Sequence, residues 1–137
     1  MIHVVAALIG KEGKFLACRR PAHKARGGLW EFPGGKREAG ETDETALARE
    51  CREELGISVC VGEKFAETEF SYPDITVHVS LYFARQEGGV IALAEHSNAR
   101  FVSPEEMKKM PFCPADEPFF VLLGEREKKN TFQGTKK

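Results

Sequence analysis

Short apolar runs and alternating apolar and polar residues, both typical of strands, occur in five stretches: residues 2–9, 14–18, 59–70, 75–85 and 99–102. Gly10-Lys11-Glu12-Gly13 separates the first two stretches and predicts a hairpin, because glycines supply the backbone freedom that a tight turn needs. Tyr72-Pro73-Asp74 lies between the two longest stretches as a second turn. The pattern therefore predicts a mixed or antiparallel sheet.

Helical patterning with capping signals occurs three times. Residues 42–55 begin with Thr42, whose hydroxyl can cap a helix, and they end before Gly56, which can adopt the left-handed conformation that stops one. Ser103-Pro104-Glu105-Glu106 combines a capping box with a proline in the first turn, and it predicts a short helix to about Met110. We expect a third helix to start near Asp116.

The length and composition fit one domain. Of 137 residues, 42% are hydrophobic, which is enough to form a core without disulfides or metals. We expect this domain to span residues 1–129. The polar, lysine-rich residues 130–137 contain little that could pack, so we expect a disordered tail there.

Charge and cysteine content argue against several classes of partner. The net charge is -1, so no global field attracts a nucleic-acid polymer. No stretch is long and apolar enough for a signal peptide or a membrane span, so we expect neither export nor insertion. The four cysteines have neither the pairing of a zinc site nor the density of a secreted disulfide scaffold. We expect a cytoplasmic protein, and the sequence indicates no oligomeric state.

The predicted helix at residues 42–55 gathers acids on one face. Glu50, Glu53 and Glu54 fall within an arc of roughly 100°, next to an apolar stripe that can pack on the sheet. Carboxylates so close repel one another unless a cation neutralises them, and oxygen ligands favour Mg²⁺, Mn²⁺ or Ca²⁺. The alternative is a solvated face with ion pairs such as Arg49 to Glu53.

The loop before this helix favours the metal site, because it supplies Gly34, Gly35 and Gly40 and adds Glu41. From Gly35 onward the sequence resembles the Nudix box, GX5EX7REUXEEXGU, in which U is a bulky aliphatic residue. Every fixed position matches, and one U position holds Cys51, which acts as a small hydrophobic residue when buried. The resemblance implies an α/β fold, the Nudix α/β/α sandwich with a mixed sheet between helices.

The resemblance also implies a chemistry. Nudix proteins hydrolyse a pyrophosphate bridge with the help of Mg²⁺, for which Mn²⁺ can substitute. Arg49 is implied to hold Glu53 in place, with Glu41 in an orienting role. Two candidates for the general base stay open: Glu53, which we favour, and Glu95, whose alternative is a solvated loop acid. The implied metal ligands are Gly35, Glu50, Glu53, Glu54 and Glu95.

Flanking segments from about residue 4 to residue 120 resemble the nucleotide pocket of MutT-like members of the family. Arg20 is placed to bind phosphate, unless it is an ordinary surface cation. Phe32 would provide an apolar wall for the base, unless it belongs to the core. The implied substrate-binding residues are Arg20, Phe32, Gly34, Gly35, Lys36 and Asp116.

Asp116 bears most directly on the choice of base. MutT has an asparagine at the matching place, where it reads 8-oxoguanine, whereas relatives that hydrolyse CTP and 5-methyl-dCTP resemble this chain in Pro114-Ala115-Asp116. Asp116 could instead cap the third helix. His96 has no fitting cluster of ligands around it in the sequence, so we expect a surface position and no zinc.

Three functions follow, in order of preference. The first is Mg²⁺-dependent hydrolysis of oxidised nucleoside triphosphates such as 8-oxo-dGTP to a monophosphate and pyrophosphate, which removes them from the nucleotide pool. The second is the same reaction on CTP, dCTP or 5-methyl-dCTP. The third is a non-catalytic module that senses a nucleotide, which the intact acids of the box argue against. In each case the expected partner is a small nucleotide.

Overall fold

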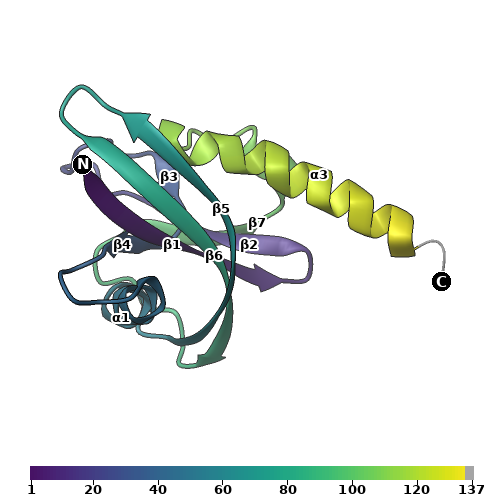
Figure 1. Cartoon of the computed structure of the whole chain (residues 1–137), viewed down its shortest axis with the longest axis horizontal. Helices are drawn as coiled ribbons and strands as arrows, with labels where there is room; N and C mark the ends of the chain where they lie inside the picture. Colours follow the sequence, from purple (N-terminus) through teal and green to yellow (C-terminus); the bar gives the residue numbers. More distant parts are fainter. Residues whose placement is uncertain (135–137) are drawn as a thin grey trace.

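The computed structural model describes the backbone of residues 1–134 and the side chains of residues 1–126. Its strands and helices follow one another along the chain as shown in Figure 1. They are β1 (Ile2–Lys11), β2 (Lys14–Arg19), β3 (Trp30–Glu31), β4 (Gly34–Lys36), α1 (Asp43–Leu55), β5 (Ser58–Ser71), β6 (Thr76–Gly88), β7 (Asn98–Val102), α2 (Pro104–Met107), the 3₁₀ turn η1 (Pro114–Asp116) and α3 (Glu117–Gly134).

The sheet is mixed, as predicted. Its order is β3-β2-β1-β6-β5, with β4 paired to β1 and β7 paired to β2. Strands β1 and β6 run parallel, and the other pairs run antiparallel. The two predicted turns are present, since β1 and β2 form a hairpin and Tyr72 exchanges backbone hydrogen bonds with Ile75 between β5 and β6.

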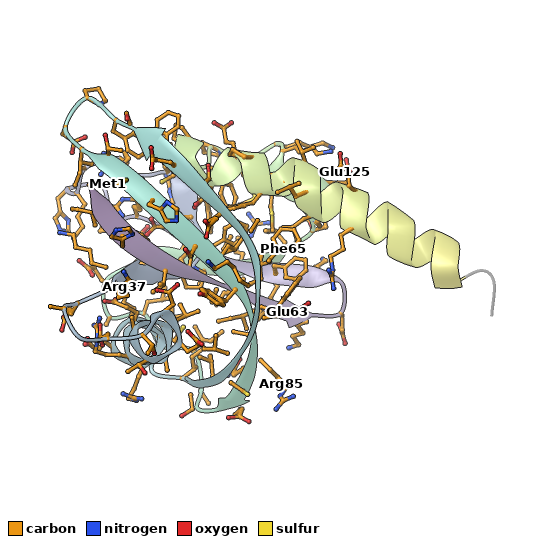
Figure 2. All side chains as sticks on the ribbon, in the orientation of Figure 1. Met1, Arg37, Glu63, Phe65, Arg85 and Glu125 are labelled. Carbon is orange, nitrogen blue, oxygen red and sulfur yellow. The ribbon has the colours of Figure 1, made fainter. Side chains whose placement is uncertain are left out.

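Helices cover both faces of the sheet, so the expected α/β/α sandwich is confirmed (Figure 1). Alternate residues of β1 point to opposite sides because successive side chains in a strand do so. Ala6 and Leu8 join the core under α3, whereas Val5 and Ile9 join the core under α1. Each helix is therefore held by its own apolar layer, and Figure 2 shows side chains filling the space between ribbons.

Helix α1 has the two ends that the sequence predicts. The Thr42 side chain accepts a hydrogen bond from the Thr45 backbone at 3.1 Å. Gly56 closes the helix in the left-handed conformation with φ 68°, and its backbone N–H donates to the Arg52 carbonyl oxygen. The buried Cys51 lies on the face against the sheet, as expected of a small hydrophobic residue. The two caps and the packed face therefore determine which way the acids of α1 point.

The later helices differ in length from the predictions. The capping box of Ser103 and Glu106 forms, but α2 ends at Met107 rather than near Met110. The single turn η1 precedes α3, which starts at Glu117. Helix α3 continues to Gly134, so it extends into residues 130–134, where the sequence predicts disorder. Residues 135–137 lie outside the described part of the chain, and the disordered tail stays a prediction there. No helix among the described residues is long and apolar enough to cross a membrane.

Candidate active site

Strand β4 and helix α1 place two neighbouring glycines in different settings. A Cβ at Gly35 would lie 2.5 Å from the Glu50 carboxyl carbon, so only glycine leaves room for that carboxylate. A Cβ at Gly34 would instead overlap the Val5 backbone, where β4 pairs with β1. Gly34 therefore permits the sheet, and Gly35 permits the position of Glu50.

This difference predicts opposite phenotypes for two similar substitutions. Gly35→Ala is expected to displace the flexible Glu50 side chain and lower kcat/KM by about 100-fold, since a shift of about 1 Å in a site can cost that much. Its melting temperature should change little. Gly34→Ala should lower the melting temperature markedly, because rigid backbone must move. Kinetics and thermal unfolding of both variants test this, and equal loss of stability in the two would contradict it.

Arg49 connects the acids of the box. Its guanidinium makes two hydrogen bonds to the Glu41 carboxylate, at 2.7 and 2.9 Å. It also donates to Glu50 at 2.9 Å and to Glu53 at 3.3 Å. Arg49 thus contacts Glu53, as the Nudix resemblance implies, but its bidentate hydrogen bonds to Glu41 are shorter than its hydrogen bond to Glu53. Those hydrogen bonds hold the pKa of Glu41 well below its usual range, at about 2.

Glu53 and Glu54 are adjacent in sequence but lie in opposite environments. The Glu53 side chain is 54% exposed and rests beside Arg49, whereas that of Glu54 is 15% exposed. Burial, followed by the neighbouring Glu50, raises the pKa of Glu54 to about 9. The Oε1 atom of Glu54 is buried and has no hydrogen-bond partner. Glu54 is therefore the acid of α1 that most needs a cation.

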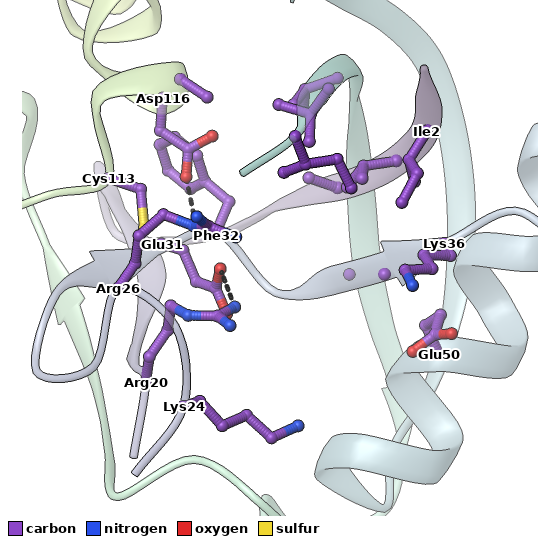
Figure 3. Close-up of a pocket in the computed structure, with 18 of the residues that line it drawn as sticks. Ile2, Arg20, Lys24, Arg26, Glu31, Phe32, Lys36, Glu50, Cys113 and Asp116 are labelled. Carbon is purple, nitrogen blue, oxygen red and sulfur yellow. Dashed lines mark hydrogen bonds and ion pairs between the residues drawn. The ribbon is translucent and has the colours of Figure 1, made fainter. Parts of the chain in front are cut away.

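The acids of α1 form one end of the site, and residues on and around β3 form the other end. Arg20 donates to the Glu31 carboxylate at 3.1 Å and to the Ala25 carbonyl at 2.8 Å, so its side chain is held (Figure 3). Phe32 is buried and packs on Phe112, yet it also lines the cavity described below. Phe32 therefore belongs to the core and also lines the cavity, and its contact with a base stays a prediction.

Asp116 lies at this same end. Its Oδ2 accepts a hydrogen bond from the Phe32 backbone N–H at 3.3 Å, across 84 residues of sequence. The carboxyl group is buried, and burial followed by the charge of Glu31 raises the pKa of Asp116 to about 8. Asp116 is thus protonated in most molecules at neutral pH, and it can then both donate and accept hydrogen bonds.

One cavity of about 660 Å³ joins the two ends, a size that fits a small molecule. Figure 3 shows Asp116 and Arg20 on one side and Lys36 and Glu50 on the other. Arg49 and Glu53 are not among the lining residues. The cavity brings together nine of the residues expected to form the site: Arg20, Phe32, Gly34, Gly35, Lys36, Glu50, Glu54, Glu95 and Asp116.

Two residues of the loop before β7 line the cavity. Glu95 forms an ion pair with Lys24. The prediction of a surface position for His96 is wrong, because the residue is 6% exposed and its Nε2 lies 3.0 Å from the Glu31 carboxylate. Sequence spacing could not reveal this contact, since 65 residues separate the two. The adjacent Glu95 was the only local signal.

The NUDIX domain matches residues 4–122 of the chain. The chain belongs to the Nudix family. The CTP pyrophosphohydrolase of Escherichia coli K12 is 42% identical over 118 residues, which cover 86% of this chain and 87% of that protein. The 8-oxo-dGTP diphosphatase of the same organism is 33% identical over 122 residues, which cover 87% of this chain and 92% of that protein.

Solved structures agree with this Nudix assignment. The solution structure of the E. coli ORF135 protein superposes with a TM-score of 0.79 at 41% identity, covering 88% of this chain and 86% of that one. The crystal structure of a MutT protein from Methanosarcina mazei Go1 gives a TM-score of 0.83 at 29% identity, with 93% and 95% covered. The Nudix fold implied by the box is therefore present over most of the chain.

Nudix hydrolases generally use divalent metal ions. Within the described residues, no three His, Cys, Asp or Glu side chains are arranged so that they could hold a metal ion together. The donors nevertheless fit one, because Glu50 and Glu54 offer the oxygen ligands that hard divalent cations prefer. A cation beside the unpartnered Oε1 of Glu54 would also stabilise the ionised carboxylate, which burial and the neighbouring Glu50 now disfavour.

Proposed function

We propose that this Nudix chain hydrolyses nucleoside triphosphates to a nucleoside monophosphate and pyrophosphate with Mg²⁺, and that Mn²⁺ can replace Mg²⁺. The observation that carries this proposal is a cavity that has acids of the box at one end and a buried carboxyl group at the other. The triphosphate would lie toward Glu50 and Glu54, and the base would lie between Phe32 and Asp116.

The chain's own residues divide the work in this proposal. Glu50 and Glu54, with the backbone at Gly35, would hold the metal, and the more exposed Glu53 and Glu95 would complete its surroundings. A bound divalent ion neutralises phosphate charge and lowers the pKa of a coordinated water. Arg49 orients Glu50 and Glu53 through the hydrogen bonds described above. Glu53 is our first candidate for the general base, and Glu95 is the second. Arg20 and Lys36 would bind phosphate oxygens.

We propose cytosine nucleoside triphosphates as the preferred substrates, a change from the order that the sequence alone favours. The support is the 42% identity to a CTP pyrophosphohydrolase together with an aspartate at position 116. The exocyclic amine of cytosine can donate a hydrogen bond to a carboxyl oxygen. The second candidate, 8-oxo-dGTP, is supported by the relative with 33% identity and by the protonated form of Asp116, which resembles an asparagine in its hydrogen bonds.

A comparison of kcat/KM for pyrophosphate release tests both candidates. The panel is CTP, dCTP, 5-methyl-dCTP, 8-oxo-dGTP, dGTP and ADP-ribose, each with Mg²⁺. A preference for cytosine nucleotides over 8-oxo-dGTP supports the first candidate, and the reverse order supports pool sanitation. Absence of turnover on every triphosphate, in protein that still binds Mn²⁺, would overturn the enzymatic proposal and favour a sensing module.

Removal of divalent ions is expected to abolish turnover and to leave the fold intact. Apolar side chains make up the two cores on either side of the sheet, whereas Arg49 pairs with Glu50 and, among the described residues, no Lys or Arg forms an ion pair with the buried Glu54. Added Mg²⁺ should restore activity and, at 100 times its Kd, stabilise the protein by about 2.7 kcal/mol. Chelation followed by Mg²⁺ or Mn²⁺ titration, read by turnover and thermal unfolding, checks this. Full activity in excess chelator would contradict it.

A further inference from the structure

His96 lies between two acids that come from different parts of the fold. Its Nε2 is 3.0 Å from the Oε2 atom of Glu31 on β3, and its Nδ1 is 3.7 Å from the Oε2 atom of Glu54 on α1. Glu31 in turn accepts a hydrogen bond from Arg20 at 3.1 Å. A continuous row of polar side chains therefore connects the guanidinium of Arg20 with the buried end of α1.

Two atoms in this row have unmet hydrogen bonds. Among the described residues, the buried side-chain atoms without a partner are the Nδ1 atom of His96 and the Oε1 atom of Glu54. Buried polar atoms are nearly always hydrogen-bonded, because a buried polar group without a partner destabilises the fold, so two such atoms facing each other are unusual. Nδ1 faces Glu54 from just beyond hydrogen-bond distance, and a shift of the carboxylate by less than about 1 Å would join them.

We propose that His96 is a positioning residue that fixes Glu54 for metal binding. In this arrangement one oxygen of Glu54 bonds to Nδ1 of His96, which leaves the other oxygen free for the cation. A metal-binding carboxylate usually has such an outer hydrogen-bond partner, whose loss costs about 10–100-fold in metal affinity. Through Nε2, the same imidazole also holds Glu31 and, with it, Arg20. The inference rests on the proposed metal-dependent function.

Two substitutions separate the two contacts of the imidazole. Asparagine places its terminal group near Nδ1, and glutamine places its terminal group near Nε2. His96→Gln keeps a partner for Glu31 and loses the one for Glu54, so Mn²⁺ affinity should fall about 10–100-fold. His96→Asn keeps the partner for Glu54, so Mn²⁺ affinity should stay within about threefold of wild type, while KM should rise as Glu31 and Arg20 lose their support.

Mn²⁺ binding is measured by electron paramagnetic resonance on nucleotide-free protein, so the readout does not depend on turnover. His3→Gln is the matched control, because this exposed histidine lies outside the cavity. Equal Mn²⁺ affinity in wild type and His96→Gln would overturn the inference, even if that variant melted at a lower temperature. Weak Mn²⁺ binding by both His96 variants would overturn the assignment of Nδ1 as the atom that positions Glu54 for metal binding.

A second measurement uses the unaltered protein and covers the case in which the variants do not fold. Mg²⁺ titration of protein labelled with ¹⁵N-histidine should shift the Nδ1 resonance of His96, and an unmoved resonance at saturating Mg²⁺ would overturn the inference. The proposed function and the proposed role of His96 can be disproved independently of each other. Wild-type protein that binds Mn²⁺ but hydrolyses no nucleotide removes the proposed function alone, whereas an active enzyme whose Mn²⁺ affinity ignores His96 removes the inference alone.

Discussion

Replacement of Glu54 by glutamine is expected to lower kcat/KM for nucleoside triphosphates by about 1,000-fold and, at the same time, to stabilise the metal-free protein at alkaline pH. The loss follows from removing a charged metal ligand, because metal assistance supplies several kcal/mol to the transition state and each 1.36 kcal/mol is tenfold in rate. Glutamine keeps the size of the side chain but not its charge.

The gain in stability follows from the pKa of Glu54, which is raised from 4.5 to about 9 in the folded protein by burial and by Glu50. Below pH 4.5 the carboxyl is protonated in both states and the folded protein loses nothing. As pH rises toward 9, the unfolded chain releases its proton and the folded protein does not, so stability falls. The glutamine variant has no proton to release at this position, and this part of the decline should disappear.

Chemical unfolding of both proteins from pH 5 to pH 9, in the presence of chelator, measures this effect. Glu63→Gln on β5 serves as the control, because it removes an exposed acid of the same size and charge. Addition of Mg²⁺ should stabilise wild type and the Glu63→Gln control but not Glu54→Gln. Parallel pH profiles for all three proteins would show that Glu54 ionises freely in the fold.

Much of the fold follows from local signals in the sequence. The five predicted strands are all present, as β1, β2, β5, β6 and β7, and α1 begins and ends where Thr42 and Gly56 predict, because capping depends on side chains a few residues away. The short strands β3 and β4 were not predicted. They contain only two and three residues, and their pairing depends on distant partners in β2 and β1. The parallel contact between β1 and β6 has no local signal either.

In the candidate site, too, features with a local sequence signal were predicted and features that depend on distant residues were not. The Nudix box identifies the acids of α1 because their spacing is local, and the resemblance implies the residues that gather in the cavity. Spacing places Glu53 and Glu54 on one face, but only the packing of α1 makes one exposed and the other buried. His96 was missed for a related reason: its environment is created by Glu31 and Glu54, from two other elements.

At the other end of the cavity, Asp116 is expected to make recognition of the base depend on pH. Its pKa, raised to about 8 by burial and by Glu31, means that the carboxyl carries a proton at pH 7 and loses it above pH 8. The protonated form can donate to N3 of cytosine or O6 of 8-oxoguanine, while its other oxygen accepts from an N–H of either base. The ionised form has no donor, so kcat/KM should fall above pH 8 for both.

Asp116→Asn provides the comparison, because an amide donates at every pH and can still accept from the Phe32 N–H. The ratio of wild-type to Asp116→Asn kcat/KM, measured from pH 6.5 to pH 9.5, cancels the pH dependence of steps that both proteins share. This ratio should fall through pH 8. A constant ratio would mean that Asp116 does not titrate in contact with the base.

The same contact predicts how unmodified guanine is treated. In dGTP both O6 and N7 are acceptors, whereas oxidation places a hydrogen on N7. On the edge of the purine that carries O6 and position 7, a carboxyl group with one donor and one acceptor makes both hydrogen bonds to 8-oxoguanine, as it does to cytosine, whereas in guanine its acceptor faces the acceptor N7. An unmade buried hydrogen bond costs about 1–3 kcal/mol, which corresponds to a discrimination against dGTP of about 5–150-fold. Asp116→Ala should reduce this discrimination to near unity, and equal discrimination in the alanine variant would assign base recognition to other residues of the cavity.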